Sequence, residues 1–137
     1  MDASIRPSRR PQTGPTTTIG WRLDEAERAG LLKRFPPLYP DVIAQHVTHK
    51  MGARPREPLP APCSGAIVGE ADDGAGVQCL VVEVEGSSLR PDGGTYHITW
   101  SLDPARNRRA IESNGVIAWL GWRTVEPVTI SLTPGRF

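Results

Sequence analysis

The chain has 137 residues, enough for one domain with a substantial core and too few for two. Its 16 basic and 15 acidic residues give a net charge of +1, so it lacks the cationic excess of a protein that coats nucleic acid. No apolar run reaches membrane-spanning length, and no hydrophobic segment of the kind found in secretory signals follows the basic N-terminus. We expect a cytoplasmic protein without membrane association, in which Cys63 and Cys79 remain reduced thiols.

The first 18 residues differ in composition from the rest of the chain. They are rich in Pro, Arg, Ser and Thr, and Ile5 is the only large apolar residue after the start. Such a segment buries too little apolar surface to offset the entropy lost on ordering. We therefore predict a disordered tail over residues 1–18 and a single domain over residues 19–137.

The next pattern is typical of a helix over residues 24–35. Asp24 and Glu27 have the spacing of a capping box, and the apolar residues that follow recur on one helical face. Pro36 ends the run, because a proline disfavours helical backbone in the residue before it.

Most of the remaining chain has the composition of short strands. Residues 72–76 form an Asp-Gly turn that predicts a hairpin, whereas the proline-rich residues 52–62 indicate an irregular connection. Residues 103–104 are expected to open a short helix or turn, and residues 106–109 an exposed basic loop. The predicted strands are residues 42–50, 66–69, 77–84, 95–102, 116–120 and 128–132. This pattern favours a small α+β fold with a mostly antiparallel sheet and one or two helices.

Two of the three histidines share a three-residue pattern. His46 and Thr48 belong to one His-x-Thr triplet, and His97 and Thr99 to another, each within a predicted strand. Because side chains alternate along a strand, each triplet places an imidazole and a hydroxyl on one face. Two such strands facing each other would assemble two groups that exchange protons near neutral pH and two hydroxyl donors. That set of groups suits a phosphodiester.

Four further residues are candidates for substrate binding. Alternation puts Lys50 and Ser101 on the same faces as the triplets, although both stand at strand ends where a solvated side chain is equally expected. Arg108, in the basic loop, and Asn114 are candidate contacts to an RNA end. The alternatives are a solvated run of charge and a simple turn.

The aromatic residues and the third histidine have other expected roles. Tyr96 and Trp100 alternate away from the triplet face, so we predict that they pack in the core. Trp119 and Trp122 are either core residues or the wall of a nucleobase pocket, and the sequence leaves both possibilities open. His49 makes an H-x-x-H pattern with His46, but on a strand the two point to opposite faces. We therefore predict neither a metal nor any other cofactor.

The two triplets, preceded by a helix and separated by a hairpin, resemble the signature of the 2H phosphoesterase superfamily. That superfamily includes 2′,5′ RNA ligase-like proteins and cyclic phosphodiesterases. Residues 40–48, 95–99 and 112–114 are similar to the cyclic phosphodiesterase module of fungal tRNA ligases and to small bacterial RNA-repair-like proteins. The resemblance covers roughly residues 22–133, with an unusually short spacing between the triplets.

The resemblance implies a bilobal sheet cleft and a metal-independent phosphoesterase of RNA repair or processing. Such an enzyme hydrolyses 2′,3′-cyclic phosphates, at an RNA 3′ end or in a small cyclic nucleotide, to 2′-phosphates. One histidine would take a proton from water, the other would give one to the leaving O3′, and Thr48 and Thr99 would bind non-bridging oxygens. Which histidine is the base stays open, and no protein partner is indicated.

Two other classes of protein remain as alternatives. The first is a non-catalytic module that binds a phosphorylated nucleotide or RNA end in the same cleft. The second is a structural domain whose two triplet histidines, His46 and His97, lie on different surfaces.

Overall fold

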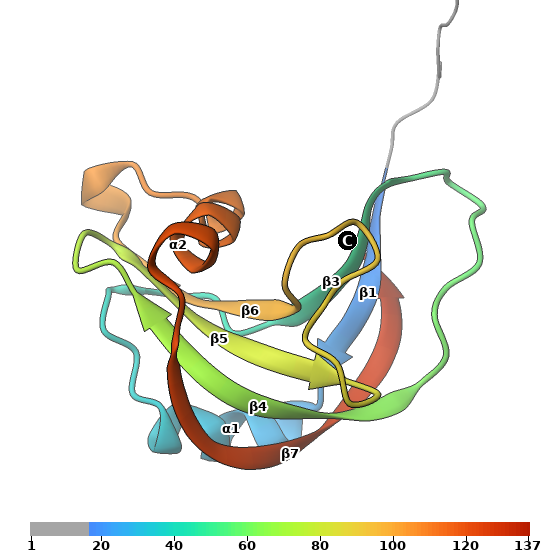
Figure 1. The fold of residues 1–137 in the computed structure, drawn as a ribbon, viewed down its shortest axis with the longest axis horizontal. Helices are drawn as coiled ribbons and strands as arrows, with labels where there is room; N and C mark the ends of the chain where they lie inside the picture. The colour runs from blue at the N-terminus through green and yellow to red at the C-terminus, as the bar shows by residue number, and fades with distance from the viewer. Residues whose placement is uncertain (1–16) are drawn as a thin grey trace, which may run out of the picture.

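A computed structural model describes residues 17–137, which fold into a seven-stranded antiparallel sheet and two α-helices (Figure 1). The strand order is β2-β6-β5-β4-β7-β1-β3. The elements are β1 (Thr17–Leu23), α1 (Glu25–Arg34), β2 (Asp41–Val42), β3 (His46–Ala53), β4 (Cys63–Asp72), β5 (Val77–Val84), β6 (His97–Leu102), α2 (Ser113–Leu120) and β7 (Arg123–Arg136). This architecture confirms the predicted α+β class and the antiparallel character of its sheet.

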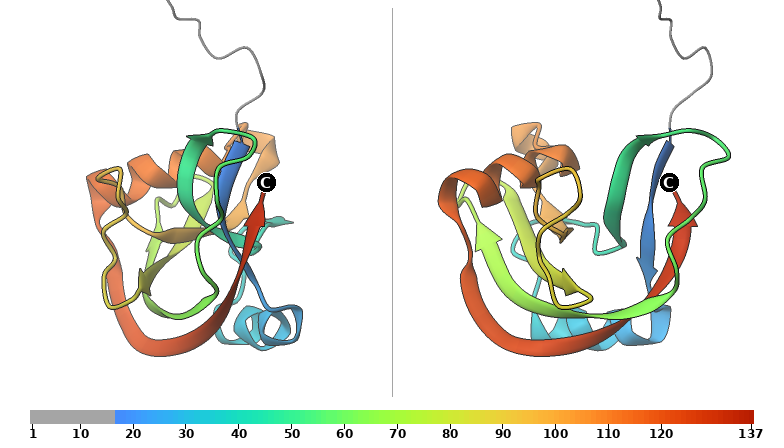
Figure 2. Two further views of the ribbon diagram at one scale, coloured as in Figure 1. Left: turned by 90° about the vertical axis from the view of Figure 1, so that its right-hand side faces the viewer. Right: turned by 45° about the vertical axis from the view of Figure 1, so that its right-hand side comes forward.

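The sheet is bent into a trough, with β5 and β6 on one side and β1 and β3 on the other (Figure 2). The long strands β4 and β7 run beneath both sides. Their register shifts where Ile67 pairs with Val128 but Gly69 pairs with Thr124, so β7 has extra residues there, Pro127 among them. Such a bulge bends a strand and increases its twist. The bend brings β3, at one edge of the sheet, opposite β6 near the other edge.

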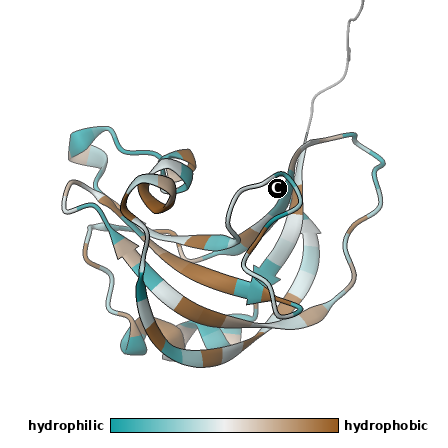
Figure 3. Cartoon of the chain, viewed as in Figure 1, coloured by the Kyte–Doolittle hydropathy of each residue, from teal (hydrophilic) through white to brown (hydrophobic). Residues whose placement is uncertain are grey.

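Two apolar clusters lie on opposite faces of β5 and β6. On one face, Leu80 and Trp100 pack with Leu31 of α1, and the Trp100 indole N–H donates to the carbonyl of Phe35 at 2.7 Å. On the other face, residues of β5 pack against Ile117 of α2. Figure 3 shows the resulting apolar character of β5, whose residues are buried with one exception. Both faces of the central strands are therefore closed, except where the α2 side opens into a cleft.

A short crossover joins β2 to β3 and places the first triplet against the second. The backbone N–H of Ala44 donates to the carbonyl of Thr99 at 3.0 Å, two residues before His46 begins β3. The Arg28 guanidinium of α1 donates to the carbonyls of Ile43 and Ala44 and holds the crossover from the other side. Ala44 adopts the left-handed backbone conformation, with φ of 44°, which redirects the chain away from β6 into β3.

Several predicted elements agree with the structure. The helix forms over Glu25–Arg34, with the Asp24 carboxylate accepting a hydrogen bond from the N–H of Glu27. The hairpin forms between β4 and β5, and the short helix at residues 104–106 is a 3₁₀ turn. The 128–132 strand is part of β7.

Other predictions about the elements need correction. The strand expected at 116–120 was wrong: these residues belong to α2, where Ser113, Val116 and Ile117 are buried at helical spacing. A short apolar run does not distinguish a buried helix from a strand. The 42–50 strand is two strands separated by the crossover. Of the predicted tail, residues 1–16 lie outside the described residues, but Thr17 and Thr18 belong to β1, a strand that was not predicted.

Within residues 17–137, no helix combines the length and the apolar character that crossing a membrane requires.

Candidate active site between the two His-x-Thr strands

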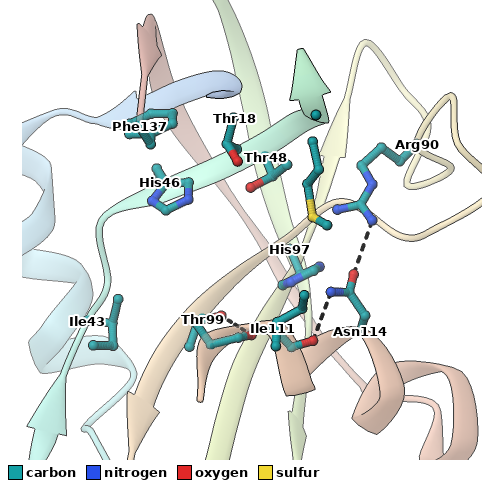
Figure 4. A pocket seen from close by; sticks show the side chains of 13 residues that line it. Thr18, Ile43, His46, Thr48, Arg90, His97, Thr99, Ile111, Asn114 and Phe137 are labelled. Carbon is teal, nitrogen blue, oxygen red and sulfur yellow. Dashed lines mark hydrogen bonds between the residues drawn. The ribbon is translucent and has the colours of Figure 1, made fainter. Parts of the chain in front are cut away.

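A cleft of about 480 Å³ lies between β3 and the α2 side of β6 (Figure 4). All four triplet residues, His46, Thr48, His97 and Thr99, line it. The two imidazoles therefore share one cleft, which argues against a domain whose histidines lie on separate surfaces. The other residues that line it are Thr18, Ile43, Met51, Gly52, Arg90, Ala110, Ile111, Asn114 and Phe137.

His97 is the more buried of the two histidines, with 8% of its surface exposed. Its Nδ1 lies 2.8 Å from the carbonyl oxygen of Thr95. A carbonyl only accepts hydrogen bonds, so Nδ1 carries the proton in the neutral ring and Nε2 is left as an acceptor. Burial lowers the pKa of His97 below its ordinary value, and the charge of Arg90 lowers it further, against the opposing effect of the Thr95 bond.

His46 is half-buried at the start of β3. Its ring stacks on that of Phe137, with 4.1 Å between ring centroids and 18° between planes, and the Arg22 guanidinium lies 4.8 Å from the Phe137 ring centroid. Burial is the main cause that lowers the pKa of His46, followed by the charges of Arg22 and His97. A protonated His97 thus disfavours the protonation of His46.

The two threonines differ in what their hydroxyls already contact. The Thr99 hydroxyl donates to the carbonyl of Ala110 at 3.2 Å and lies 2.9 Å from the Ser113 hydroxyl. Because a hydroxyl has one proton, Thr99 would have to give up a bond within the protein to donate to a ligand. Within residues 17–137, the Thr48 side chain forms no hydrogen bond, so its hydroxyl is the one available to a ligand.

The structure places two of the expected substrate-binding residues outside the cleft. Lys50 is exposed and forms an ion pair with Glu57 at 2.6 Å, in the connection that follows β3. Ser101 is fully buried and donates to the side chain of Gln78 at 2.6 Å, while the N–H of Tyr39 donates to Ser101. Each strand has a register shift just after its triplet threonine: Thr48 pairs with Gly20 but Lys50 with Ile19, and Thr99 pairs with Cys79 but Ser101 with Gln78. Such a bulge interrupts the alternation of side chains, so the prediction that Lys50 and Ser101 share the cleft face was wrong.

The prediction of an exposed basic loop was wrong for Arg108, which is partly buried. Its guanidinium forms ion pairs with Asp73 at 2.8 Å and Glu112 at 2.7 Å and donates to the carbonyl of Ala75. Arg108 therefore ties the β4–β5 turn to the segment before α2 and does not line the cleft. Both carboxylates have pKa values below the ordinary range. For Asp73, burial is the largest single effect and raises the pKa, but its hydrogen bonds and the Arg108 charge together lower the pKa by more. For Glu112, the hydrogen bond from Arg108 is the main cause of the lowered pKa.

Asn114 does line the cleft, but its amide is already engaged. Its Oδ1 accepts from the Arg90 guanidinium at 3.1 Å, and its Nδ2 donates to the carbonyl of Ile111 at 2.9 Å. Asn114 is thus better placed to hold Arg90 than to read a ligand.

Arg90 is a charged residue of the cleft that the sequence did not predict. It stands in the loop between β5 and β6, where residues 91–94 have the composition of a simple turn. The turn forms around the Asp92 carboxylate, which accepts from the N–H of Gly94 at 2.9 Å and from the Arg90 Nε at 2.9 Å. A lone arginine before a turn gives no signal of burial, so only the three-dimensional arrangement could identify it.

The remaining aromatic and histidine predictions are settled by position. Tyr96 and Trp100 pack in the core, as predicted. His49 points away from the cleft, where its Nδ1 is 3.0 Å from the Tyr96 hydroxyl. Neither Trp119 nor Trp122 lines the cleft, and both are exposed. In the described part of the chain, no three His, Cys, Asp or Glu side chains gather as metal ligands would.

Comparisons with protein-family models, with curated proteins and with solved structures found no match to this chain.

Proposed function

We propose that the protein is a metal-independent phosphoesterase of the 2H type that hydrolyses 2′,3′-cyclic phosphates to 2′-phosphates. The substrate is an RNA 3′ end or a small cyclic nucleotide. The observation that carries this proposal is that His46 and His97, from strands near opposite edges of the sheet, line one cleft together with their threonines. A bent sheet that pairs two imidazoles in this way supplies both partners of a proton-transfer reaction.

The proposed reaction consumes one water. A neutral imidazole accepts a proton from water as the water oxygen bonds to phosphorus, and the protonated second imidazole gives its proton to O3′ as the P–O3′ bond breaks. The products are a 2′-phosphomonoester and a free 3′-hydroxyl. Because both histidines have lowered pKa values, the singly protonated state that this step needs reaches its maximum at a lower pH than it would with two ordinary histidines.

The size and walls of the cleft support a nucleotide as substrate. Its volume of about 480 Å³ falls in the range of small-molecule sites, roughly 300–1,000 Å³. Ile43, Ile111 and Phe137 give it apolar walls against which a ribose or a base can pack. Thr48 is the hydroxyl positioned to donate to a phosphate oxygen.

A non-catalytic binder of phosphorylated nucleotides is the second candidate. The observation that favours it is the Thr99 hydroxyl, which is bonded within the protein rather than open to a ligand. A binder requires the same cleft but no proton transfer, so hydrolysis separates the two candidates.

The test is hydrolysis of the four nucleoside 2′,3′-cyclic monophosphates and of a short RNA with a cyclic-phosphate end, all in EDTA. We expect the wild type to release 2′-phosphates, and His46→Ala and His97→Ala each to lose a factor of about 10² or more. His49→Gln is the matched control, because this third histidine lies outside the cleft, and it should retain turnover.

Two results would count against the proposed reaction. Absence of turnover on all five substrates, with the same nucleotides still bound, would identify the binder. Release of 3′-phosphates would contradict the proposed leaving group, even if both histidines were required.

A further inference from the structure

Arg90 is buried in the cleft to an extent that is unusual for an arginine. Only 5% of its side chain is exposed, and arginine is rarely buried so fully unless its charge is paired. Its partner Asp92 is 47% exposed and so remains largely solvated. The ion pair therefore neutralises Arg90 only partly, and its charge extends to His97, whose pKa it helps to lower.

The hydrogen bonds of Arg90 leave part of its guanidinium unused. Of its five N–H groups, one on Nε donates to Asp92 and one on Nη2 donates to Asn114. Within residues 17–137, Nη1 donates to no group. Figure 4 shows the guanidinium directed into the cleft, toward Asn114 and His97. The planar group is thus fixed on one side and available on the other.

The remaining charges around the cleft indicate the sign of the ligand. The residues of the described chain that line the cleft include Arg90 and two imidazoles but no Asp or Glu. A cleft with a buried cation and no carboxylate of its own favours an anion. A guanidinium presents its N–H groups in a fork that matches two oxygens of a phosphate, which makes arginine well suited to this role.

We propose that Arg90 is the phosphate-binding cation of this cleft, with Asn114 and Asp92 as the residues that position it. This inference rests on the proposed function of the same site and specifies where the phosphate lies, between the Arg90 guanidinium and the Thr48 hydroxyl. One prediction follows from charge alone. A phosphomonoester carries close to two negative charges at pH 7 and a cyclic diester carries one, so the product binds more tightly than the substrate.

A first experiment uses the wild-type protein and therefore does not depend on a variant that folds. The Arg90 Nε–H resonance is followed by ¹⁵N NMR during titration with inorganic phosphate and then with adenosine 2′-monophosphate. A chloride titration at matched ionic strength is the control. We expect phosphate and the nucleotide to shift this resonance saturably and chloride to leave it unchanged. An unmoved Arg90 signal, with shifts at His46 or His97, would overturn the proposal.

A second experiment separates charge from geometry. Arg90→Lys keeps the positive charge and loses the fork, whereas Arg90→Gln loses both, so we expect the Kd for phosphate to rise moderately in the first and at least tenfold in the second. Arg56→Gln is the matched control, since Arg56 is exposed and does not line the cleft. Equal Kd values in Arg90→Gln and Arg56→Gln, with both proteins folded by circular dichroism, would reject Arg90 as the binding cation.

Asn114→Ala tests the positioning role. It leaves the guanidinium in place but removes one of its two fixed contacts, so KM should rise more than kcat falls, and the Arg90 Nε–H resonance should shift in the free protein. An unchanged resonance and an unchanged KM would show that Asn114 does not hold Arg90.

The outcomes distinguish this inference from the proposed function. If phosphate shifts the Arg90 Nε–H resonance but no cyclic phosphate is hydrolysed, the anion site is supported and the enzymatic function is rejected. If hydrolysis occurs and Arg90→Gln retains the wild-type KM, kcat and phosphate Kd, the enzyme stands and Arg90 is not part of its binding site.

Discussion

Histidines that are buried in the neutral state make stability depend on pH in a defined direction. Both His46 and His97 have pKa values below the ordinary 6.5, chiefly because burial disfavours the charged ring. Below about pH 6.5 the unfolded chain therefore binds protons that the folded protein does not bind. Under linkage the free energy of unfolding then rises with pH across this range, so stability is lost as the pH falls from 7 toward 5.

We expect urea unfolding to give a lower free energy of unfolding at pH 5 than at pH 7. His97→Asn should flatten this dependence, because the folded protein then has one fewer group that resists protonation. The carboxylates with lowered pKa values, such as Glu112, contribute mainly at still lower pH, so they do not obscure the result. A dependence in His97→Asn that is as steep as in the wild type would contradict the assignment, because only His46 should then contribute.

For single residues, the sequence predicts that the triplet side chains line the cleft but not which hydrogen bonds each one forms. Strand alternation is a local rule, and it placed His46, Thr48, His97 and Thr99 correctly on the cleft face. It could not show that Ser113 and Ala110 engage the Thr99 hydroxyl, or that Arg90 is buried, because those contacts join segments far from the triplets. The burial of a single arginine depends on the fold and cannot be predicted from the residues next to it in the sequence.

The close approach of β1 and β3 fixes the position of the first triplet. Gly20 of β1 pairs with Thr48, and a Cβ at Gly20 would lie 2.1 Å from the Val47 carbonyl oxygen and 3.0 Å from the Thr48 Cα. These are backbone atoms, so no side chain can rotate to relieve the clash. Any side chain at this position must push β3, and the triplet on it, away from β1.

We expect Gly20→Ala to destabilise the fold by about 1–3 kcal/mol, as overpacking does, and to reduce hydrolysis beyond the loss of folded protein. Gly30→Ala is the matched control. Gly30 is exposed in α1 with no atom within 4 Å of the added Cβ, so its replacement should stabilise the helix by about 0.5–1 kcal/mol. Urea unfolding measures both changes. Equal stabilities for the two variants would show that β1 and β3 can separate without cost.

The elements that were predicted correctly are those whose signals are local. The cap and proline of α1, and the Asp-Gly turn of the β4–β5 hairpin, each lie within a few residues of the structure they specify. The errors concern α2, β1 and the break between β2 and β3. The apolar run at 116–120 is helical because it packs on β5, and β1 is a strand because it fits between β3 and β7. Such tertiary partners override weak local preferences.

The bend of the whole sheet determines the shape of the cleft. The His-x-Thr triplets do not predict that β3 and β6 face each other. These strands are at positions seven and two in the strand order. That arrangement depends on the bulge between β4 and β7 and on the crossover held by Arg28. The cleft thus has one histidine from each side of the trough, and a ligand bound between them must bridge the two sides.

This bridging predicts how a bound nucleotide changes stability. A ligand that binds only the folded protein stabilises it by about 2.7 kcal/mol when present at one hundred times its Kd. We expect adenosine 2′-monophosphate to raise Tm accordingly, and both His46→Asn and His97→Asn to lose most of the increase, since each removes the contact to one side. Lys50→Ala, on β3 but outside the cleft, should retain it.

Thermal unfolding of the wild type and these three variants, with and without the nucleotide, makes the measurement. If only one histidine variant lost the increase, the ligand would occupy one side of the trough alone. That result would contradict the proposed reaction, in which one imidazole accepts a proton from water and the other gives a proton to O3′ of the same phosphate. An equal loss in the two variants, with none in Lys50→Ala, is the result that a ligand spanning β3 and β6 requires, because the two histidines come from opposite sides of the bend.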